Sequence, residues 1–250
     1  MKDQLNRAIC VKDVPIRIIS LVPSQTELLY DLGLESSIVG ITKFCVHPPH
    51  FKKEKTIVGG TKDVRYEKII ALQPDIILCN KEENTLEMIQ RLETIASVHI
   101  SDIGSIEDCL ELIGMYGRLF KKEERADQIS QLIIDEKESF DSFIKNAPRL
   151  KTAYFIWKKP WMVAAKQTFI DNMLSLNNFD NYYSHLNRYP EIELSETYME
   201  TAELVLLSSE PFPFKDVDVE LIRTYFPQSK VLIVDGEAFS WYGMRLLKAF

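Results

Sequence analysis

Short apolar runs alternate with stretches of helical spacing along the first 100 residues. Runs of this kind, bounded by turn residues, are typical of strands buried on both faces of a parallel sheet. The strands expected from them are Ile16–Val22, Ile38–Thr42, Asp75–Asn80 and Ser97–Ile100. The helices expected between them are Thr26–Leu32, Arg65–Leu72 and Glu83–Ile95. This alternation predicts an N-terminal α/β lobe over residues 1–120.

The middle of the chain is continuously helical in pattern, with helices expected at Ser105–Phe120 and Lys122–Asn146. In the second of these, the apolar residues recur at spacings of three, four, seven and three, at Ala126, Ile129, Ile133, Phe140 and Phe143. That spacing is typical of one buried helix face. A helix of this length would span about 35 Å at 1.5 Å per residue, so we expect a backbone helix over residues 121–148.

The remaining residues, 149–250, repeat the alternation of strands and helices. The expected strands are Thr152–Trp157, Trp161–Ala165, Glu203–Leu207 and Val231–Val234. The expected helices are Thr168–Leu176, Glu196–Ala202, Val217–Tyr225 and Trp241–Phe250. The fold class predicted for the whole chain is therefore α/β, with two Rossmann-like lobes built on parallel sheets and joined by one long backbone helix.

Composition narrows the class of partner. Hydrophobic residues make up 46% of the chain and charged residues 27%, which excludes a disordered protein. No apolar run approaches the roughly 18 residues that a membrane span needs, so none is expected. The net charge of −7 and the scattered lysines argue against nucleic acid. The four cysteines lie far apart without CxxC spacing, and we expect buried free thiols.

The first residues carry charges that interrupt any apolar stretch, at Lys2, Asp3, Arg7, Lys12 and Asp13. No secretory signal peptide is therefore visible before the first strand. Two interpretations stay open: a cytoplasmic protein, or a natural start upstream of Met1.

Five segments resemble the helical-backbone (class III) substrate-binding proteins of ABC importers, the family that binds cobalamin and iron siderophores. The segments are PSQTE at 23–27, EKIIALQPD at 67–75, TFIDNMLSLNNFDNYY at 168–183, RYPEIELSE at 188–196 and VDGEAFSWYGMRLL at 234–247. The resemblance implies a monomer that holds a metal chelate between its lobes and delivers it to a permease dimer. The ligand implied is cobalamin, a ferric siderophore or haem, with no cofactor required. Such relatives work outside the inner membrane.

The resemblance also implies ligand contacts. His47 falls where cobalamin-binding relatives carry an aromatic residue that contacts the corrin, and Tyr189-Pro190 resembles the aromatic–proline pair that borders their cleft. We expect His47 and Tyr189 to contact the ligand jointly. The family pattern has tryptophans near Thr61 and Asn80, and this chain has neither, which leaves the identity of the chelate open.

Other candidate contacts follow predicted strands or lie in the closing helix. They are Trp157, Trp161, Trp241, Asn80 and Arg245. Aromatic faces offer a large, stiff contact area to a flat ligand. For Trp157 and Trp161 a place in the core of a hairpin is the competing interpretation.

Cys45, His47 and His50 have a spacing that permits metal ligation. Pro48 and Pro49 stiffen the loop and oppose convergence of the three side chains, so an ordinary loop is the alternative.

Glu67 and Glu196 match the carboxylates, one on each lobe, that relatives present to permease arginines. Each lies early in an expected helix, where the helix dipole alone favours a carboxylate by about 0.3–1 kcal/mol.

No acid/base pair, nucleophile motif or phosphate-binding glycine loop is present, so we predict a binding protein and not an enzyme. The leading hypothesis is capture of a metal chelate or corrinoid for an importer. A cytosolic metal-sensing or ligand-storage protein, and an enzyme on the same scaffold, are the alternatives.

Overall fold

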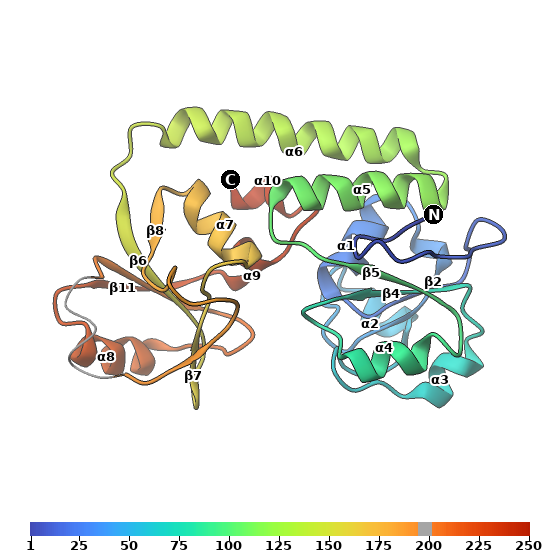
Figure 1. Ribbon diagram of the computed structural model, residues 1–250, viewed down its shortest axis with the longest axis horizontal. Helices are drawn as coiled ribbons and strands as arrows, with labels where there is room; N and C mark the ends of the chain where they lie inside the picture. Colours follow the sequence, from blue (N-terminus) through green and yellow to red (C-terminus); the bar gives the residue numbers. More distant parts are fainter. Residues whose placement is uncertain (195–201) are drawn as a thin grey trace. The chain divides into compact units, whose positions relative to one another are not determined.

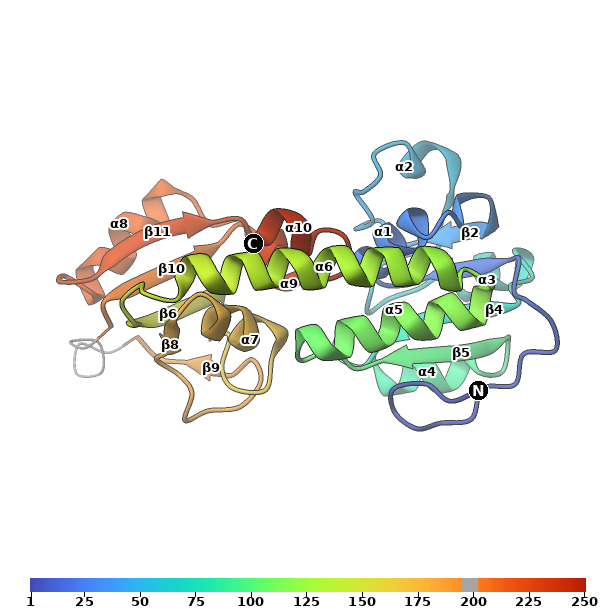
Figure 2. The same cartoon turned by 90° about the horizontal axis from the view of Figure 1, so that it is seen from above.

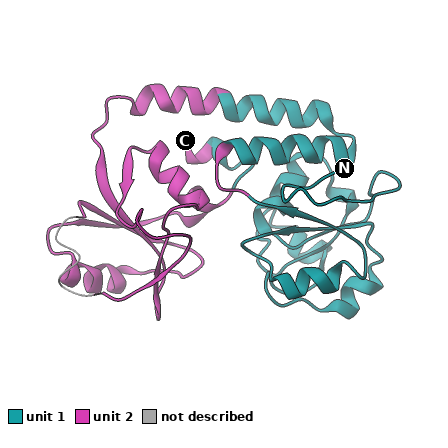
Figure 3. Cartoon of the chain, viewed as in Figure 1, with its two compact units in different colours: residues 1–102, 107–134, 242–247 teal, residues 103–106, 135–241, 248–250 magenta. Residues whose placement is uncertain are grey.

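The computed structural model describes residues 1–194 and 202–250, and Figure 3 colours the two units into which they divide. Unit 1 comprises residues 1–102, 107–134 and 242–247, and unit 2 comprises residues 103–106, 135–241 and 248–250. This division differs from the expected boundaries at three places, one of which is residues 103–106, expected in the N-terminal lobe and found in unit 2. The first half of the long helix and residues 242–247 both belong with unit 1.

Unit 1 is built on a parallel sheet of five strands in the order β3-β2-β1-β4-β5 (Figure 1). The strands are β1 (Ile18–Ser20), β2 (Ile38–Ile41), β3 (Thr56–Ile57), β4 (Ile76–Asn80) and β5 (Ser97–Ser101). Every residue of β1 and β4 is buried, as expected for central strands covered on both faces. The four predicted strands are confirmed, and β3 was missed.

The helices that begin in the first 120 residues are α1 (Pro23–Asp31), the 3-10 turn η1 (Glu35–Ser37), α2 (Phe51–Glu54), α3 (Tyr66–Ala71), α4 (Leu86–Leu92) and α5 (Ile106–Phe120). Helix α1 begins three residues before the predicted Thr26, because a proline is tolerated in the first helical turn, where its missing N–H costs nothing. Gly33 follows α1 with φ 74°, the left-handed conformation that ends many helices.

Unit 2 is built on a mixed sheet. Its strands are β6 (Leu150–Trp157), β7 (Trp161–Val163), β8 (Phe179–Asn181), β9 (Glu191–Ile192), β10 (Leu204–Ser208) and β11 (Lys230–Val234). The order is β11-β10-β6-β7-β9, with β8 paired to β6. Strands β6, β10 and β11 are parallel, whereas β7 runs antiparallel to both β6 and β9. The α/β class is confirmed, with a sheet that is only partly parallel because of the β6–β7 hairpin.

The remaining helices are α7 (Phe169–Leu176), α8 (Asp216–Tyr225), α9 (Gly236–Ser240) and α10 (Leu246–Ala249). The single closing helix predicted at Trp241–Phe250 is wrong. Helix α9 ends before Trp241, and Gly243 adopts φ 91°, which breaks a helix and separates α9 from α10. The helix predicted at Glu196–Ala202 falls almost wholly outside the described residues.

The long helix is confirmed as α6 (Glu123–Ile144), 22 residues that begin in unit 1 and end in unit 2 (Figure 2). Ala126, Ile129 and Ile133 are buried as predicted, but Phe143 is 81% exposed. The apolar face therefore continues into the second half of the helix only in part. Across residues 1–194 and 202–250, no helix combines the length and the apolar character that crossing a bilayer requires.

Candidate functional site

A buried polar network closes the carboxyl ends of the strands in unit 1. The Gln25 amide donates to Ser101 Oγ at 2.6 Å and to Tyr242 Oη at 3.0 Å. The Tyr116 hydroxyl donates to Gln25 Oε1 at 2.6 Å. All four side chains are buried, and burial raises the pKa of Tyr242 to about 12, which keeps this phenol neutral. The network holds α1, β5, α5 and the segment after α9 together.

Asn80, a predicted ligand contact, ends β4 inside the same network. Its Nδ2 donates to Ser101 Oγ at 2.9 Å, and its Oδ1 accepts from the Glu82 backbone N–H at 2.8 Å. The residue is 4% exposed. The Asn80 side chain therefore shapes the loop that follows β4, and its contact with a ligand stays a prediction.

Arg245, another predicted contact, makes a bidentate ion pair with Glu27. The guanidinium donates to the two carboxylate oxygens at 2.8 Å and 2.7 Å. The two side chains are only 11% and 18% exposed. Paired, partly buried charges of this geometry are strong, so Arg245 fastens the segment after α9 to α1. Binding of an anionic ligand group by Arg245 stays a prediction.

The loop between β2 and α2 does not assemble the predicted metal ligands Cys45, His47 and His50. The Cys45 thiol is buried against the hydroxyls of Thr26 and Thr42, at 3.1 Å and 3.3 Å. Burial raises the pKa of the Cys45 thiol, which disfavours the thiolate that a metal requires.

His47 is half-buried, and the His50 ring turns toward η1, where Nε2 lies 2.7 Å from Glu35 Oε1. Among the described residues, the metal-ligating side chains that converge are instead Glu35, His50 and Glu54.

Unit 2 presents four aromatic rings, the aromatic group, where β6 and β10 end. Trp157, the last residue of β6, is 37% exposed and makes a T-shaped contact with Phe212, at 5.6 Å between ring centroids. Trp161 stacks on Phe214 at 6.1 Å with an interplanar angle of 8°. Phe212 and Phe214 lie 4.8 Å apart. Trp161 also packs on the core of unit 2, as the competing interpretation held, whereas Trp157 stands at the surface.

Phe212 and Phe214 were not among the ligand contacts predicted from the sequence. The available signal was the segment Pro211-Phe212-Pro213-Phe214 directly after β10, since prolines and aromatics past a strand end are typical of a stiff surface loop.

The two remaining aromatic candidates are less accessible. Tyr189 is half-buried and packs on the apolar cluster that contains Tyr154 and Leu206. Trp241 is 7% exposed, and its Nε1 donates to Glu210 Oε1 at 2.6 Å. Burial raises the pKa of the Glu210 carboxyl. The Trp241 indole therefore ties the end of α9 to Glu210, and its contact with a ligand stays a prediction.

Of the two carboxylates predicted to dock on a permease, the structure describes only Glu67. Glu67 is exposed in the first turn of α3, as a docking residue must be. Glu196 lies outside the described residues.

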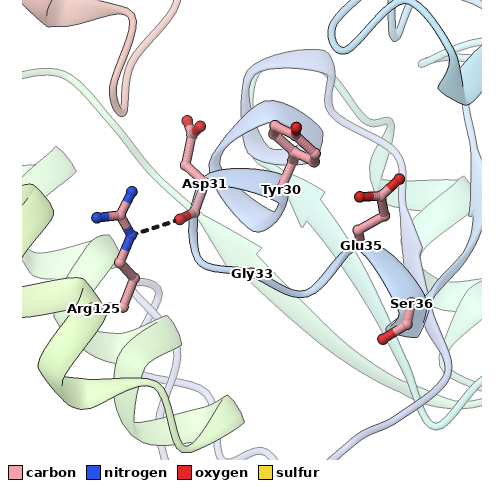
Figure 4. Close-up of a pocket in the computed structure, with 6 residues that line it drawn as sticks. All are labelled: Tyr30, Asp31, Gly33, Glu35, Ser36 and Arg125. Atoms are coloured by element: carbon pink, nitrogen blue, oxygen red, sulfur yellow. Dashed lines mark hydrogen bonds between the residues drawn. The ribbon is translucent and has the colours of Figure 1, made fainter.

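A hollow of about 590 Å³ lies in unit 1, lined by Tyr30, Asp31, Gly33, Glu35, Ser36 and Arg125 (Figure 4). Arg125 Nε donates to the Asp31 carbonyl at 2.9 Å, which ties α6 to the end of α1. The predicted ligand contacts are absent from the lining of this hollow, so it is a separate feature of unit 1.

Two α/β units connected by one 22-residue helix define the architecture of a helical-backbone binding protein. The model of the family described as "Periplasmic binding protein" matches residues 18–209, and the chain belongs to this family. The family is one of binding proteins, which agrees with the non-catalytic class predicted from the sequence.

Two relatives illustrate the range of similarity in sequence. The chain is 25% identical over 245 residues to the vitamin B12-binding protein of Pectobacterium atrosepticum, a match covering 94% of this chain and 86% of that protein. It is 28% identical over 187 residues to YvrC of Bacillus subtilis, described as an uncharacterized ABC transporter substrate-binding lipoprotein. That second match covers 72% of this chain and 59% of YvrC.

Solved structures share the fold. The periplasmic vitamin B12 binding protein BtuF of Vibrio cholerae superposes with a TM-score of 0.82 at 17% identity, covering 94% of each chain. The periplasmic haem-binding protein BhuT, in complex with two haems, superposes with a TM-score of 0.80 at 17% identity, covering 93% of this chain and 94% of that one. These likenesses confirm the predicted two-lobe α/β fold.

Proposed function

We propose that this chain is the substrate-binding component of an ABC importer and that it captures a corrinoid, with vitamin B12 as the first candidate. The observation that carries the proposal is the match to a vitamin B12-binding protein over 94% of the chain. The family membership supports the importer role, and the missing catalytic motifs agree with it.

The aromatic group of unit 2 supports a flat ligand. Trp157 is 37% exposed, and Trp161 and Phe212 are partly buried members of the same aromatic group. Rings held by packing lose little freedom on binding, so they suit a rigid macrocycle. Haem is also a flat metal macrocycle, and it is the second ligand candidate.

His47 of unit 1 and Tyr189 of unit 2 are the proposed side-chain anchors. Each is half-buried and is adjacent to a proline, Pro48 or Pro190. Glu67 and Glu196 are the proposed permease contacts. We also propose that this protein works outside the cytoplasmic membrane, since YvrC is named as a lipoprotein and BtuF as a periplasmic protein.

Equilibrium dialysis of the purified protein against cyanocobalamin, haemin and a ferric hydroxamate siderophore tests the proposal. We expect saturable binding of one cyanocobalamin per chain. Saturable binding of haemin or the siderophore alone would keep the importer role and replace the ligand. Binding of none of the three would overturn the proposal.

The anchors are tested in the same assay. His47→Ala and Tyr189→Ala should each weaken binding by roughly 1–3 kcal/mol, the range for removal of a contact in a binding site. His185→Ala is the matched control, because His185 is an exposed histidine in unit 2 that was not predicted to contact the ligand. Wild-type affinity in both anchor variants would contradict their assignment.

A further inference from the structure

Three metal-ligating side chains converge on the surface of unit 1, and one of them, His50, was a predicted metal ligand. Glu35 comes from η1, His50 directly precedes α2 and Glu54 ends α2. One ligand atom from each lies within 4.8 Å of the other two. In Figure 4 the Glu35 carboxylate lies on the opposite side of the hollow from Arg125, so the guanidinium does not occupy this cluster.

Local structure brings the three side chains together. His50 and Glu54 are four residues apart, a spacing that places side chains on the same face of a helical turn. The rings of Tyr30 and Phe51 meet the His50 imidazole edge-on, at 6.0 Å and 5.0 Å between centroids. This packing orients the imidazole toward Glu35, where Nε2 and Oε1 are 2.7 Å apart.

The donor set has the chemistry of a transition-metal site. One imidazole and two carboxylates suit Zn²⁺, whereas Mg²⁺ and Ca²⁺ prefer oxygen ligands alone. Zinc bonds of about 2.0–2.2 Å place tetrahedral ligand atoms about 3.3–3.6 Å apart. The observed separations, from 2.7 Å to within 4.8 Å, bracket that spacing, so small side-chain rotations complete the site.

We propose that Glu35, His50 and Glu54 bind a divalent ion of the Zn²⁺ class, with water completing the coordination. The His50 and Glu35 side chains are 39% and 43% exposed, which leaves room for that water. This site is additional to the proposed importer function and does not depend on it.

Nearby lysines should weaken the affinity of this site for a metal ion. Lys55 Nζ donates to the Glu35 carbonyl at 2.7 Å, and Lys52 and Lys53 are exposed on α2. These cations oppose a divalent ion, so we expect micromolar affinity instead of the much tighter binding of a closed structural zinc site.

The ion would restrain the loop that carries His47. Glu35 and His50 are 15 residues apart in sequence, and a shared metal would close the segment between them, which contains β2 and the loop that follows it. Closing a loop removes conformations from it. His47 lies three residues before His50, so the metal would hold a proposed ligand anchor in place.

Calorimetric titration of the metal-free protein with Zn²⁺ alone tests the site, in a Cys10→Ser background that removes the exposed thiol. We expect one ion per chain. Glu35→Gln, His50→Gln and Glu54→Gln should each weaken binding by at least about tenfold. The matched controls, Glu107→Gln and His185→Gln, change exposed residues elsewhere and should bind like the parent.

Tryptic cleavage after the exposed Lys43 gives a second measurement, because Lys43 lies in the loop that the ion would close. Zn²⁺ should slow this cleavage in the parent and not in His50→Gln. Melting curves in EDTA check that the variants fold. Absent or non-saturable binding, unchanged affinity in all three ligand variants, or equal affinity for Mg²⁺ would each overturn the proposal.

Discussion

The carboxyl ends of the strands carry different side chains in the two units, although both sheets are built from strand–helix units. In unit 1 this edge is polar and internally satisfied, with Gln25 and Ser101 at its centre. In unit 2 the same kind of edge is aromatic, and Trp157 is 37% exposed. Since ligands of α/β folds bind at the carboxyl ends of strands, the side chains that follow the last strand residue decide what each unit offers.

The two edges illustrate two roles that side chains can have at the end of a sheet, stabilising the fold or contacting a ligand. A buried polar network makes one arrangement rigid, because each member left without a partner would be costly. A surface ring such as Trp157, held by its aromatic neighbours, leaves apolar area available for a ligand at little cost in ordering. Unit 1 is therefore expected to contribute stability at this edge, and unit 2 contact area.

The strongest test of the polar edge is Gln25→Leu. The substitution removes the buried acceptor of the Tyr116 hydroxyl and the amide that donates to Ser101 and Tyr242, so the free energy of unfolding should fall by roughly 3–5 kcal/mol. Denaturant unfolding measures this loss. Gln128→Leu, at an exposed position on α6, should change stability by about 0.5 kcal/mol or less. Equal effects at the two positions would mean that the network stabilises nothing.

Acid should weaken unit 1 through His99 on β5. Neither ring nitrogen of this buried histidine has a hydrogen-bond partner among the described residues, and burial lowers its pKa from 6.5 to about 4. The unfolded chain therefore takes up the proton first. His99 costs the fold nothing above pH 6.5, and stability falls between pH 6.5 and pH 4, by up to about 3 kcal/mol.

His99→Phe keeps an aromatic ring beside Tyr116 and removes the titration. Unfolding measured at pH 7 and pH 4.5 should show a smaller acid loss in this variant than in the parent. The same loss in both proteins would assign the acid sensitivity to other groups.

Arg245→Met tests whether the ion pair with Glu27 is structural. Removing one partner of a partly buried pair should lower the free energy of unfolding by about 2–3 kcal/mol, and a double-mutant cycle with Glu27→Gln should show coupling. If the guanidinium acts only through this ion pair, cyanocobalamin affinity should stay unchanged. A large loss of affinity with little loss of stability would return Arg245 to the ligand site.

Trp157→Ala should lower ligand affinity more than stability, the reverse of the effect expected for Arg245→Met. The indole is partly exposed, so stability should fall by about 1 kcal/mol or less, whereas ligand affinity should fall by roughly 1–3 kcal/mol. Parallel measurements of unfolding and cyanocobalamin binding separate the two. Loss of stability with normal affinity would make Trp157 a packing residue and remove the contrast between the two edges.

The sequence predicted the elements whose patterns are long. The 22-residue helix α6 was recognised because it spans several helical turns, and the buried runs at β4 and β10 because each has five consecutive buried residues. The three-residue strand β1 was recognised because it lies inside the longer apolar run Ile16–Val22. Strands β3 and β9 have only two residues each, too few for an alternation to be visible.

The side-chain contacts of the candidate site were harder to predict, because the residues that pair with one another are distant in sequence. Arg245 and Glu27 are 218 residues apart, and Gln25 and Tyr242 are 217 apart. No local pattern shows that Arg245 is already paired. Within the metal-ligating cluster, His50 was a predicted metal ligand, whereas Glu35, 15 residues away in sequence, and Glu54 were missed. Cys10 was expected to be buried and is exposed, whereas the other three cysteines are buried.

Tryptophan fluorescence tests the central claim most directly, because all three tryptophans, Trp157, Trp161 and Trp241, belong to unit 2. A corrinoid bound against the aromatic group should quench their emission in a saturable way, reaching its limit at one cyanocobalamin per chain. Free N-acetyltryptophanamide at the same cobalamin concentrations gives the control for light absorbed by the ligand. Emission that falls only as much as this control, with cyanocobalamin and with haemin, would contradict the account.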